Sequence, residues 1–246
     1  FDPKPVDAPE WERWKTATTR LDPLWKRLFV HYPSLWKLFA KGAGVTLAVS
    51  VLAMLLAVSL GLLLALTRAY GPRPARWTAI AYTEVFRGTP LLVQLTVVYF
   101  GLPELGLTLS PFVAGVLALG LNYAAAEAEN YRAGLTSVPR GQLEAARALG
   151  LTQPQALRFV VAPQAIRVAL PPVTNDFIAL LKDSALVSLV TLTDLTKTYV
   201  QLAGGLRDHL GLGLVVAAWY LLLGLPFAWL ARRLEKKLGQ DLRRAA

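Results

Sequence analysis

Residues 42–67 read GAGVTLAVSVLAMLLAVSLGLLLALT, a run of 26 residues without a charged side chain. A helix rises about 1.5 Å per residue, so roughly 20 mostly apolar residues cross the hydrocarbon core of a bilayer. Leucine, valine and alanine make up most of this stretch. The stretch therefore predicts a membrane-spanning helix and places the chain among membrane proteins.

The composition of the whole chain supports this class. Of its 246 residues, 54% are hydrophobic and 17% are charged, whereas soluble proteins carry about 25% charged residues. The net charge of +10 does not indicate nucleic-acid binding, because the basic residues cluster just outside the apolar runs. The absence of cysteine excludes disulfides, thiolate metal sites and cysteine nucleophiles. Both histidines lie outside the apolar runs, and the first run is too long for a cleavable signal peptide.

Five apolar runs are long enough to cross a membrane, which predicts an all-α membrane protein with five transmembrane helices. The second run contains the sequence RGTP (87–90), which is expected to interrupt its helix. The predicted spans are Gly42 to Thr67, about Trp77 to Gly101, about Pro111 to Ala128, about Pro172 to Thr193, and Leu210 to Ala231.

The distribution of basic residues predicts the orientation. Segments 68–76, 132–167 and 232–244 together hold fourteen Lys and Arg residues, while the other side holds six close to a span. The positive-inside rule therefore places the C-terminus in the cytoplasm and the N-terminus outside the cytoplasmic (inner) membrane.

The same topology divides the chain into three parts. Residues 42–231 form the transmembrane domain, and 232–246 form a basic cytoplasmic tail. Residues 1–41 carry four tryptophans. They are expected to be extracytoplasmic, as an amphipathic helix on the outer face of the cytoplasmic membrane. A disordered lead or a truncated upstream span are the alternatives for this segment.

Residues 137–163 are too short and too polar to cross the membrane. Ser137 is expected to cap a helix whose early turn holds Pro139, and Gly150 to end it in a left-handed conformation. Thr152 begins a second short helix, with Gln155 at the spacing of a capping box. The prolines at 163, 171 and 172 are expected to end this helix before the fourth span.

The first helix of this hairpin has the composition of a docking site rather than of a surface loop that happens to be helical. Its small residues allow a partner to approach the backbone closely, while Glu144 and Arg147 offer charge at the rim. The small residues are Ala145, Ala146, Ala148 and Gly150.

This hairpin resembles the EAA loop in the membrane subunits of ATP-binding-cassette importers. The pattern of that loop is Glu-Ala-Ala, three residues, Gly, nine residues and Ile-x-Leu-Pro. The matching residues here are Glu144, Ala145, Ala146 and Gly150, followed by Val160, Val161, Ala162 and Pro163. Val160 replaces Ile and Ala162 replaces Leu, while the spacing fits throughout.

Three longer stretches narrow the resemblance to polar amino-acid permeases of the histidine/glutamine/arginine type. They are FRGTPLLVQL (86–95), NYRAGLTSVPRGQLEAARALG (130–150) and APQAIRVALPPVTNDFIALLKDSALVS (162–188). The resemblance covers roughly residues 42–231. Ala126 departs from it, because such permeases usually carry an aromatic residue there, and Glu127 stands at a position that is usually uncharged.

The resemblance implies a type I importer permease fold and transport by alternating access. It implies two permease subunits, as a homodimer or a heterodimer, together with two ATPase subunits and an extracytoplasmic solute-binding protein. ATP and magnesium would be bound by the ATPase, because this chain has no GxxxxGK[ST] phosphate loop; the chain is then a transport subunit in the lipid bilayer and not an enzyme. The implied ATPase-coupling residues are Glu144, Ala145, Ala146, Arg147 and Gly150.

Polar residues inside the spans are candidates for contact with the transported amino acid, because charge is costly there. Counted from the span ends, Arg87, Asn122, Lys182 and Asp183 all reach a similar depth near the midplane. Arg87 or Lys182 is expected to bind the carboxylate of an amino acid and Asp183 its ammonium. The full candidate set is Asn122, Asp183, Ser184, Lys182, Arg87 and Glu84.

Several alternatives remain at this point. Glu84 and Arg87 are three residues apart and can pair with each other instead. Glu129 and Arg132 are expected to form a local ion pair, whereas Glu127 hints at a preference for a cationic substrate.

Two other functions compete with import, and the identity of the amino acid is open. An intramembrane enzyme would depend on a serine–lysine pair such as Ser184 with Lys182. A passive channel would differ from an importer in lacking ATP-dependent accumulation.

Overall fold

The computed structural model describes residues 22–244, with side chains described for 22–234 and for 236. Every regular element in this range is a helix, and no strand occurs within it. The predicted all-α class is therefore confirmed. Residues 1–21, about half of the segment 1–41 that was predicted to be extracytoplasmic, fall outside the described residues.

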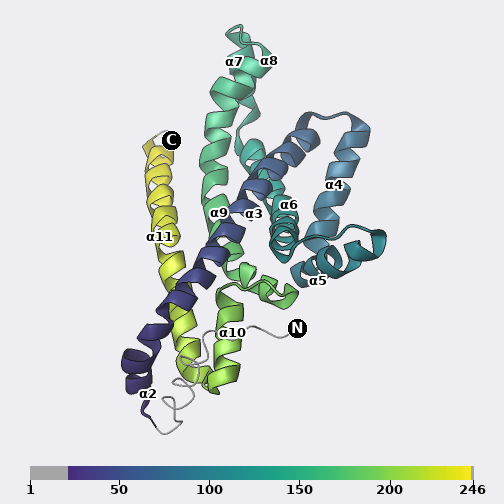
Figure 1. The fold of residues 1–246 in the computed structure, drawn as a ribbon. Coiled ribbons are helices and arrows are strands. Elements are labelled where there is room, and N and C mark those ends of the chain that lie inside the picture. Colours follow the sequence, from purple (N-terminus) through teal and green to yellow (C-terminus); the bar gives the residue numbers. More distant parts are fainter. Residues whose placement is uncertain (1–21, 245–246) are drawn as a thin grey trace.

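The helices run in chain order along an elongated bundle (Figure 1). The first half comprises α2 (Leu24–Lys26), η1 (Arg27–His31), η2 (Tyr32–Leu35), α3 (Trp36–Tyr70), α4 (Arg73–Gly88), α5 (Leu91–Thr96), η3 (Val97–Gly101) and η4 (Leu102–Leu105). The second half comprises α6 (Pro111–Ser137), α7 (Arg140–Ala148), α8 (Gln153–Ala156), η5 (Leu157–Val161), α9 (Ala162–Asp183), η6 (Ser184–Val190), α10 (Leu195–Leu206) and α11 (His209–Arg244).

The first apolar run belongs to a helical stretch that is longer than predicted. Helices α2 to α3 join into one stretch of 47 residues, Leu24–Tyr70, which ends where Gly71 and Pro72 follow. Small buried residues such as Ala57 and Gly61 let α6 approach α3 closely. A side chain at Gly61 would come within 3.0 Å of the Ala124 carbonyl oxygen of α6, so helix contact here depends on backbone proximity.

The second predicted span is broken into two helices. Helix α4 ends at Gly88, and α5 begins at Leu91 with its axis turned by 104°. Thr89 between them is extended, with φ −115° and ψ 141°, as expected for a residue before proline. The break at RGTP was therefore predicted correctly, but the span does not continue in a straight line to Gly101. We call residues 86–94 the elbow.

Several predictions about the hairpin and the start of the fourth span are wrong. A single helical stretch runs from Gln153 through α8, η5 and α9 to Asp183, so neither Pro163 nor the Pro171-Pro172 pair ends a helix. The fourth predicted span thus begins inside a helix and not at a break. The predicted Ser137 cap is also wrong, because Ser137 closes α6 and its hydroxyl donates to the Gly134 carbonyl at 2.8 Å.

Three helical stretches within 22–244 are long and apolar enough to cross a membrane: Leu24–Tyr70, Pro111–Ser137 and His209–Leu234. The bent α4–α5 pair adds a fourth if the two helices are counted as one span. Helix α9 is not among them, because its polar residues and prolines, together with its charged residues, lower its mean hydropathy. Five spans are therefore not established by length and composition alone.

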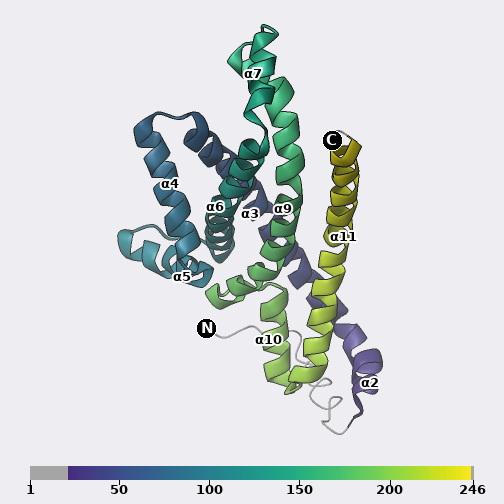
Figure 2. The ribbon, with the colours of Figure 1, turned by 180° about the vertical axis from the view of Figure 1, so that it is seen from behind.

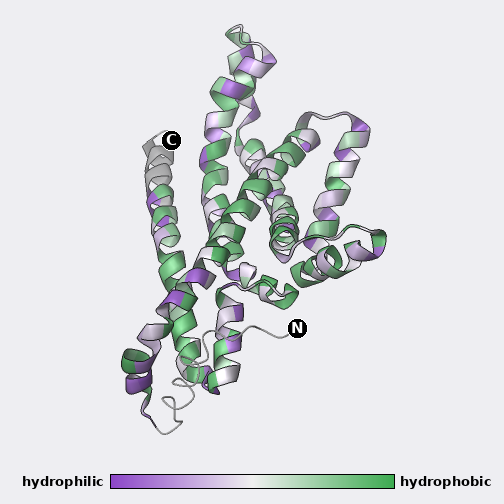
Figure 3. Cartoon of the chain, viewed as in Figure 1, coloured by the Kyte–Doolittle hydropathy of each residue, from purple (hydrophilic) through white to green (hydrophobic). Residues whose placement is uncertain are grey.

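The arrangement of the ends agrees with the predicted sidedness of the basic segments. The α3–α4 turn, the α7–α8 hairpin and the C-terminal part of α11 lie toward one end of the bundle, whereas α2 and the α10–α11 connection lie at the other (Figures 1 and 2). Apolar residues line most of α3 and α11 between these ends, and hydrophilic residues gather on the hairpin (Figure 3).

Candidate functional site

The elbow is held by two side-chain amides. The carbonyl of Phe86 cannot receive the usual helical hydrogen bond, because the residue four positions on is Pro90, which has no N–H. Gln94 Nε2 donates to this carbonyl at 2.9 Å, and Asn122 Nδ2 of α6 donates to it at 3.2 Å. Asn122 also donates to Gln94 Oε1 at 3.1 Å, so the two amides support each other.

This geometry changes the interpretation of Asn122 and adds Gln94 to the functional residues. Asn122 was predicted to contact substrate, but in this conformation its amide group binds the elbow. Gln94 was missed by sequence reasoning. The available signal was a polar residue in the apolar run LLVQLT (91–96), four positions after Pro90.

Asp183 lies at the end of α9 and is bound to α6. Its Oδ2 accepts a hydrogen bond from the hydroxyl of Tyr123 at 2.8 Å. Tyr123 is the chain neighbour of Asn122, so one turn of α6 reaches both the elbow and Asp183. Asp183 and Lys182 are both exposed on the isolated subunit and are open to a ligand.

Ser184 does not share this exposure. It is fully buried, and its hydroxyl donates to the Leu181 carbonyl at 2.8 Å. This conformation therefore does not offer Ser184 to a substrate. This burial also counts against the alternative of an intramembrane enzyme. In a serine–lysine pair the serine must reach both the lysine and a substrate, but Ser184 is buried while Lys182 is exposed.

Glu84 and Arg87 are both exposed on α4. No ion pair within the described residues joins them, so the alternative in which they neutralise each other is wrong for this conformation. They remain available to a ligand or to another subunit.

A second polar layer lies between α3, α6 and α9. Asn130 Nδ2 of α6 donates to Asp176 Oδ2 of α9 at 2.8 Å. Glu127, one turn earlier on α6, is completely buried and faces Gly61 of α3, where an added side chain would come 2.6 Å from Glu127 Cβ. Glu127 is thus enclosed in this conformation, and its proposed influence on substrate charge stays a prediction.

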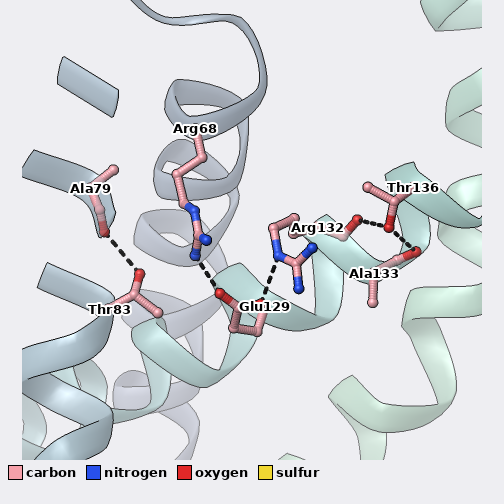
Figure 4. Close-up of polar contacts among 7 residues, drawn as sticks. All are labelled: Arg68, Ala79, Thr83, Glu129, Arg132, Ala133 and Thr136. Carbon is pink, nitrogen blue, oxygen red and sulfur yellow. Dashed lines mark hydrogen bonds and ion pairs between the residues drawn. The ribbon is translucent and has the colours of Figure 1, made fainter. Parts of the chain in front are cut away.

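The predicted local ion pair between Glu129 and Arg132 is confirmed. Arg132 Nε lies 2.7 Å from Glu129 Oε2, and Arg68 at the end of α3 pairs with the other carboxylate oxygen (Figure 4). Glu129 is therefore bound by two arginines and joins α3 to α6. It is a structural ion pair near the end of the bundle that carries the hairpin.

The predicted left-handed helix end is present at Gly150, whose φ is +85°. The Gly150 N–H donates to the Arg147 carbonyl at 2.9 Å, and the Leu151 N–H donates to the Ala146 carbonyl at 3.1 Å. These two bonds form a Schellman motif, which satisfies the last carbonyls of α7. The predicted capping box of Thr152 and Gln155 is present as well, so α7 and α8 are joined by a fixed turn.

The exposure of α7 partly corrects the predicted docking face. Glu144, Ala145 and Arg147 are exposed, but Ala146 is only 4% exposed and packs inside the hairpin. Leu149 at the tip is 85% exposed and was missed by sequence reasoning. A large apolar residue directly before the terminating glycine of a polar helix was the available signal.

A broken helix, a polar layer between long apolar helices and a hairpin at one end are features compatible with a membrane transport subunit. Residues 57–240 match the family model described as the binding-protein-dependent transport system inner membrane component. The chain belongs to this family.

Relatives of similar length are amino-acid permeases. The chain is 36% identical over 212 residues to an L-cystine transport system permease protein of Bacillus subtilis (strain 168). The aligned residues cover 84% of this chain and 91% of that protein. It is 35% identical over 203 residues to the glutamine transport system permease protein of Escherichia coli (strain K12), covering 82% and 93% respectively.

The fold agrees with these relatives. A solved amino acid ABC transporter with histidines has 39% sequence identity and a TM-score of 0.80, covering 85% of this chain and 98% of that one. The methionine ABC transporter MetNI in an inward-facing conformation has a TM-score of 0.65 at 24% identity, which supports the fold alone. The predicted family and type I permease fold are therefore confirmed.

Proposed function

We propose that this chain is the membrane subunit of an ATP-driven importer for a polar amino acid, coupled to a separate ATPase through the α7–α8 hairpin. The observation that carries the proposal is this hairpin: a helix with an exposed charged and small-residue face, closed by a Schellman motif, projects from the bundle of a chain in the permease family. The names of the relatives favour an amino acid as cargo.

In this proposal the hairpin binds a cleft on the ATPase subunit. Leu149 is the apolar anchor, because a side chain 85% exposed to water gains free energy when a partner covers it. Glu144 and Arg147 flank it with charges that fix the register, and Ala145 permits close approach. The turn at Gly150 transmits movement of the ATPase to α6 and α9, to which the hairpin is directly connected.

We propose that the chain crosses the cytoplasmic membrane five times, with α9 as the fourth crossing and the α4–α5 pair as a broken one. Charged residues on α9 are then tolerated because they face other helices or a water-filled path. The basic segments at the hairpin end place this end in the cytoplasm. The opposite end receives the solute-binding protein, and a second permease subunit completes the path.

We place the ammonium group of the substrate at Asp183, in contact with the Tyr123 hydroxyl. The exposed cations Lys182 and Arg87 are candidates for the substrate carboxylate, and Glu84 lies on the same exposed helix as Arg87. An interrupted helix beside such groups is typical of substrate sites in transporters. Alternating access would expose this site to each side of the membrane in turn.

The coupling proposal is tested with Leu149→Ala and Glu144→Ala in the complete complex, reconstituted with its ATPase and binding protein. We expect reduced co-purification of the ATPase and loss of ATP-dependent uptake, while the thermal unfolding temperature of the permease is unchanged. The matched control is Leu105→Ala, the same substitution at a side chain 77% exposed on η4, with ATPase co-purification as its readout. Uptake that persists without any ATPase would refute the proposal.

The substrate site is tested separately with Asp183→Asn. This change removes the charge but keeps a hydrogen-bond acceptor for Tyr123, so the fold should persist. We expect the amino acid to stimulate ATP hydrolysis less in the variant, measured against concentration. Unchanged stimulation would remove Asp183 from the site while leaving the coupling proposal intact.

A further inference from the structure

Polar contacts at two neighbouring residues of α6 connect the elbow to Asp183, the residue proposed to bind the ammonium group of the substrate. At one end, Gln94 binds the Phe86 carbonyl and the Asn122 amide, with N···O distances of 2.9 and 3.1 Å. At the other end, the Tyr123 hydroxyl binds Asp183 at 2.8 Å. Because Asn122 and Tyr123 are consecutive residues of α6, the two ends share one helical turn.

Gln94 has more partners than satisfaction of one carbonyl requires. Its Nε2 also lies 2.7 Å from the Thr89 hydroxyl and 3.2 Å from the Thr89 carbonyl. Gln94 thus binds the last turn of α4, the linker and α6 from its own position on α5. These contacts fix the direction of α5 relative to both helices.

We infer that Gln94 is a positioning residue for substrate recognition: it fixes the angle of the elbow and, through Asn122 and the α6 turn, the place of the Tyr123–Asp183 pair. Gln94 makes no contact with the substrate in this arrangement. The inference rests on the proposed function, since it assigns Asp183 to the substrate site. It commits to the same cargo class, an amino acid whose ammonium group binds Asp183.

A positioning role and a purely structural role predict different outcomes for one double variant. Gln94→Leu removes the donor to the Phe86 carbonyl, which leaves a partly buried acceptor with fewer partners and lowers stability. Pro90→Ala supplies the missing N–H from the backbone. The double variant is therefore expected to regain stability, but by continuing the helix of α4 instead of holding the bend.

The experiment uses the complete reconstituted complex. Gln94→Leu should raise the amino-acid concentration that half-stimulates ATP hydrolysis by roughly fivefold, the equivalent of one lost hydrogen bond. Adding Pro90→Ala should restore the thermal unfolding temperature and leave this concentration high. Recovery of both quantities in the double variant would overturn the inference, because satisfying the carbonyl would then be sufficient.

Two further variants control for side-chain chemistry. Gln94→Glu keeps an acceptor for Asn122 but cannot donate to Phe86, so it should resemble Gln94→Leu in substrate response. Gln201→Leu makes the same substitution at an exposed position of α10 and should change neither quantity. A substrate response of Gln94→Glu equal to that of the unaltered protein would overturn the role assigned to the donor.

A distance measurement tests the elbow without reference to transport. The chain has no cysteine, so spin labels at Val85→Cys and Val93→Cys, exposed by 59% and 49%, report the elbow alone. We expect one narrow distance distribution, which broadens with Gln94→Leu and shifts to longer distances with Pro90→Ala added. An unaltered distribution would refute the inference even if transport is confirmed, and so would the expected distance change with an unchanged amino-acid response. A complex whose ATP hydrolysis responds to no amino acid, even before any substitution, would refute the proposed function instead.

Discussion

Two proline sites in this chain have opposite effects on the helix that contains them. At Pro90 the chain turns by 104° between α4 and α5, whereas at Pro171 and Pro172 the helix α9 continues for eleven further residues to Asp183. The residue types are the same and each proline removes a helical hydrogen bond. The surroundings of the freed carbonyl groups, and not the prolines alone, account for the difference.

At the elbow, the freed carbonyl of Phe86 is partly buried and receives two side-chain donors, Gln94 and Asn122. In α9 the freed carbonyls belong to Arg167 and Val168, both of which are exposed residues. Helix α9 continues past its prolines along α6, against which it packs. A proline therefore bends this chain where other side chains replace the lost bond in a bent geometry, and it leaves the helix intact where a neighbouring helix fixes the axis.

The first prediction tests the packing that keeps α9 straight. A side chain at Gly134 of α6 would come 2.6 Å from the Ala165 carbonyl oxygen and 3.2 Å from Ala169 Cβ. Gly134→Ala should therefore lower stability by about 1–3 kcal/mol and weaken assembly with the ATPase. Thermal unfolding of the purified complex measures the change.

The matched control lies in α11, where a side chain at Gly224 would meet nothing within 4 Å. Gly224→Ala should be neutral or stabilising by up to about 1 kcal/mol, because alanine favours the helix. Equal effects of the two substitutions would show that the α6–α9 contact does not depend on the absence of a side chain at Gly134.

The second prediction removes the proline of the elbow while Gln94 stays in place. In Pro90→Ala the new N–H competes with Gln94 and Asn122 for the Phe86 carbonyl. One such bond is worth about 0.5–1.5 kcal/mol, so uptake should fall by roughly two- to tenfold as straight conformers appear. Uptake at the level of the unaltered protein would show that the elbow needs no proline.

The sequence alone predicted the elements whose signals are local. The apolar runs located α3, α6 and α11, the RGTP stretch located the elbow, and Gly150 located the end of α7. Each signal lies within a few residues of the feature it predicts. The same holds for the Glu129–Arg132 pair, which lies three residues apart on one helix.

The predictions that failed depended on contacts between distant segments. The Pro171-Pro172 pair was expected to end a helix because proline disfavours the interior of a helix. The helix nevertheless continues where it packs on α6. Asn122 and Gln94 lie 28 residues apart in the chain, so their mutual bond was invisible to a spacing argument. The burial of Ser184 and Ala146 likewise depends on which side of each helix faces the bundle.

The third prediction concerns the start of α11, outside the spans. There the carboxylate of Asp208 accepts a backbone hydrogen bond, whereas side-chain amides donate at the elbow. Asp208 precedes α11, and its Oδ1 accepts a hydrogen bond from the Gly211 N–H at 2.9 Å. Arg27 Nη1 lies 2.8 Å from Asp208 Oδ2. Burial acts to raise the pKa of Asp208, but hydrogen bonds from Tyr32 and the Gly211 N–H and the charge of Arg27 lower it below its usual value.

A carboxylate whose pKa is lowered by folding stabilises the folded state at every pH above its unfolded value of about 3.9. The unfolding temperature should therefore stay constant between about pH 7 and pH 5 as far as Asp208 contributes, and fall as pH drops through the lowered pKa. Asp208→Asn should be less stable at pH 7 and lack this acid-dependent loss. A variant that keeps the full loss would assign it to other carboxylates.

The fourth prediction has the smallest effect and completes the comparison of the two proline sites. Pro172→Ala returns an N–H to α9 that can bond the Val168 carbonyl, yet the direction of α9 is already fixed by α6. Val168 is an exposed residue, so returning one hydrogen bond to its carbonyl should change stability by about 1 kcal/mol or less. Uptake should match that of the unaltered protein. A loss of uptake as large as that of Pro90→Ala would mean that α9 also bends during transport, and that its straight form is one of two states.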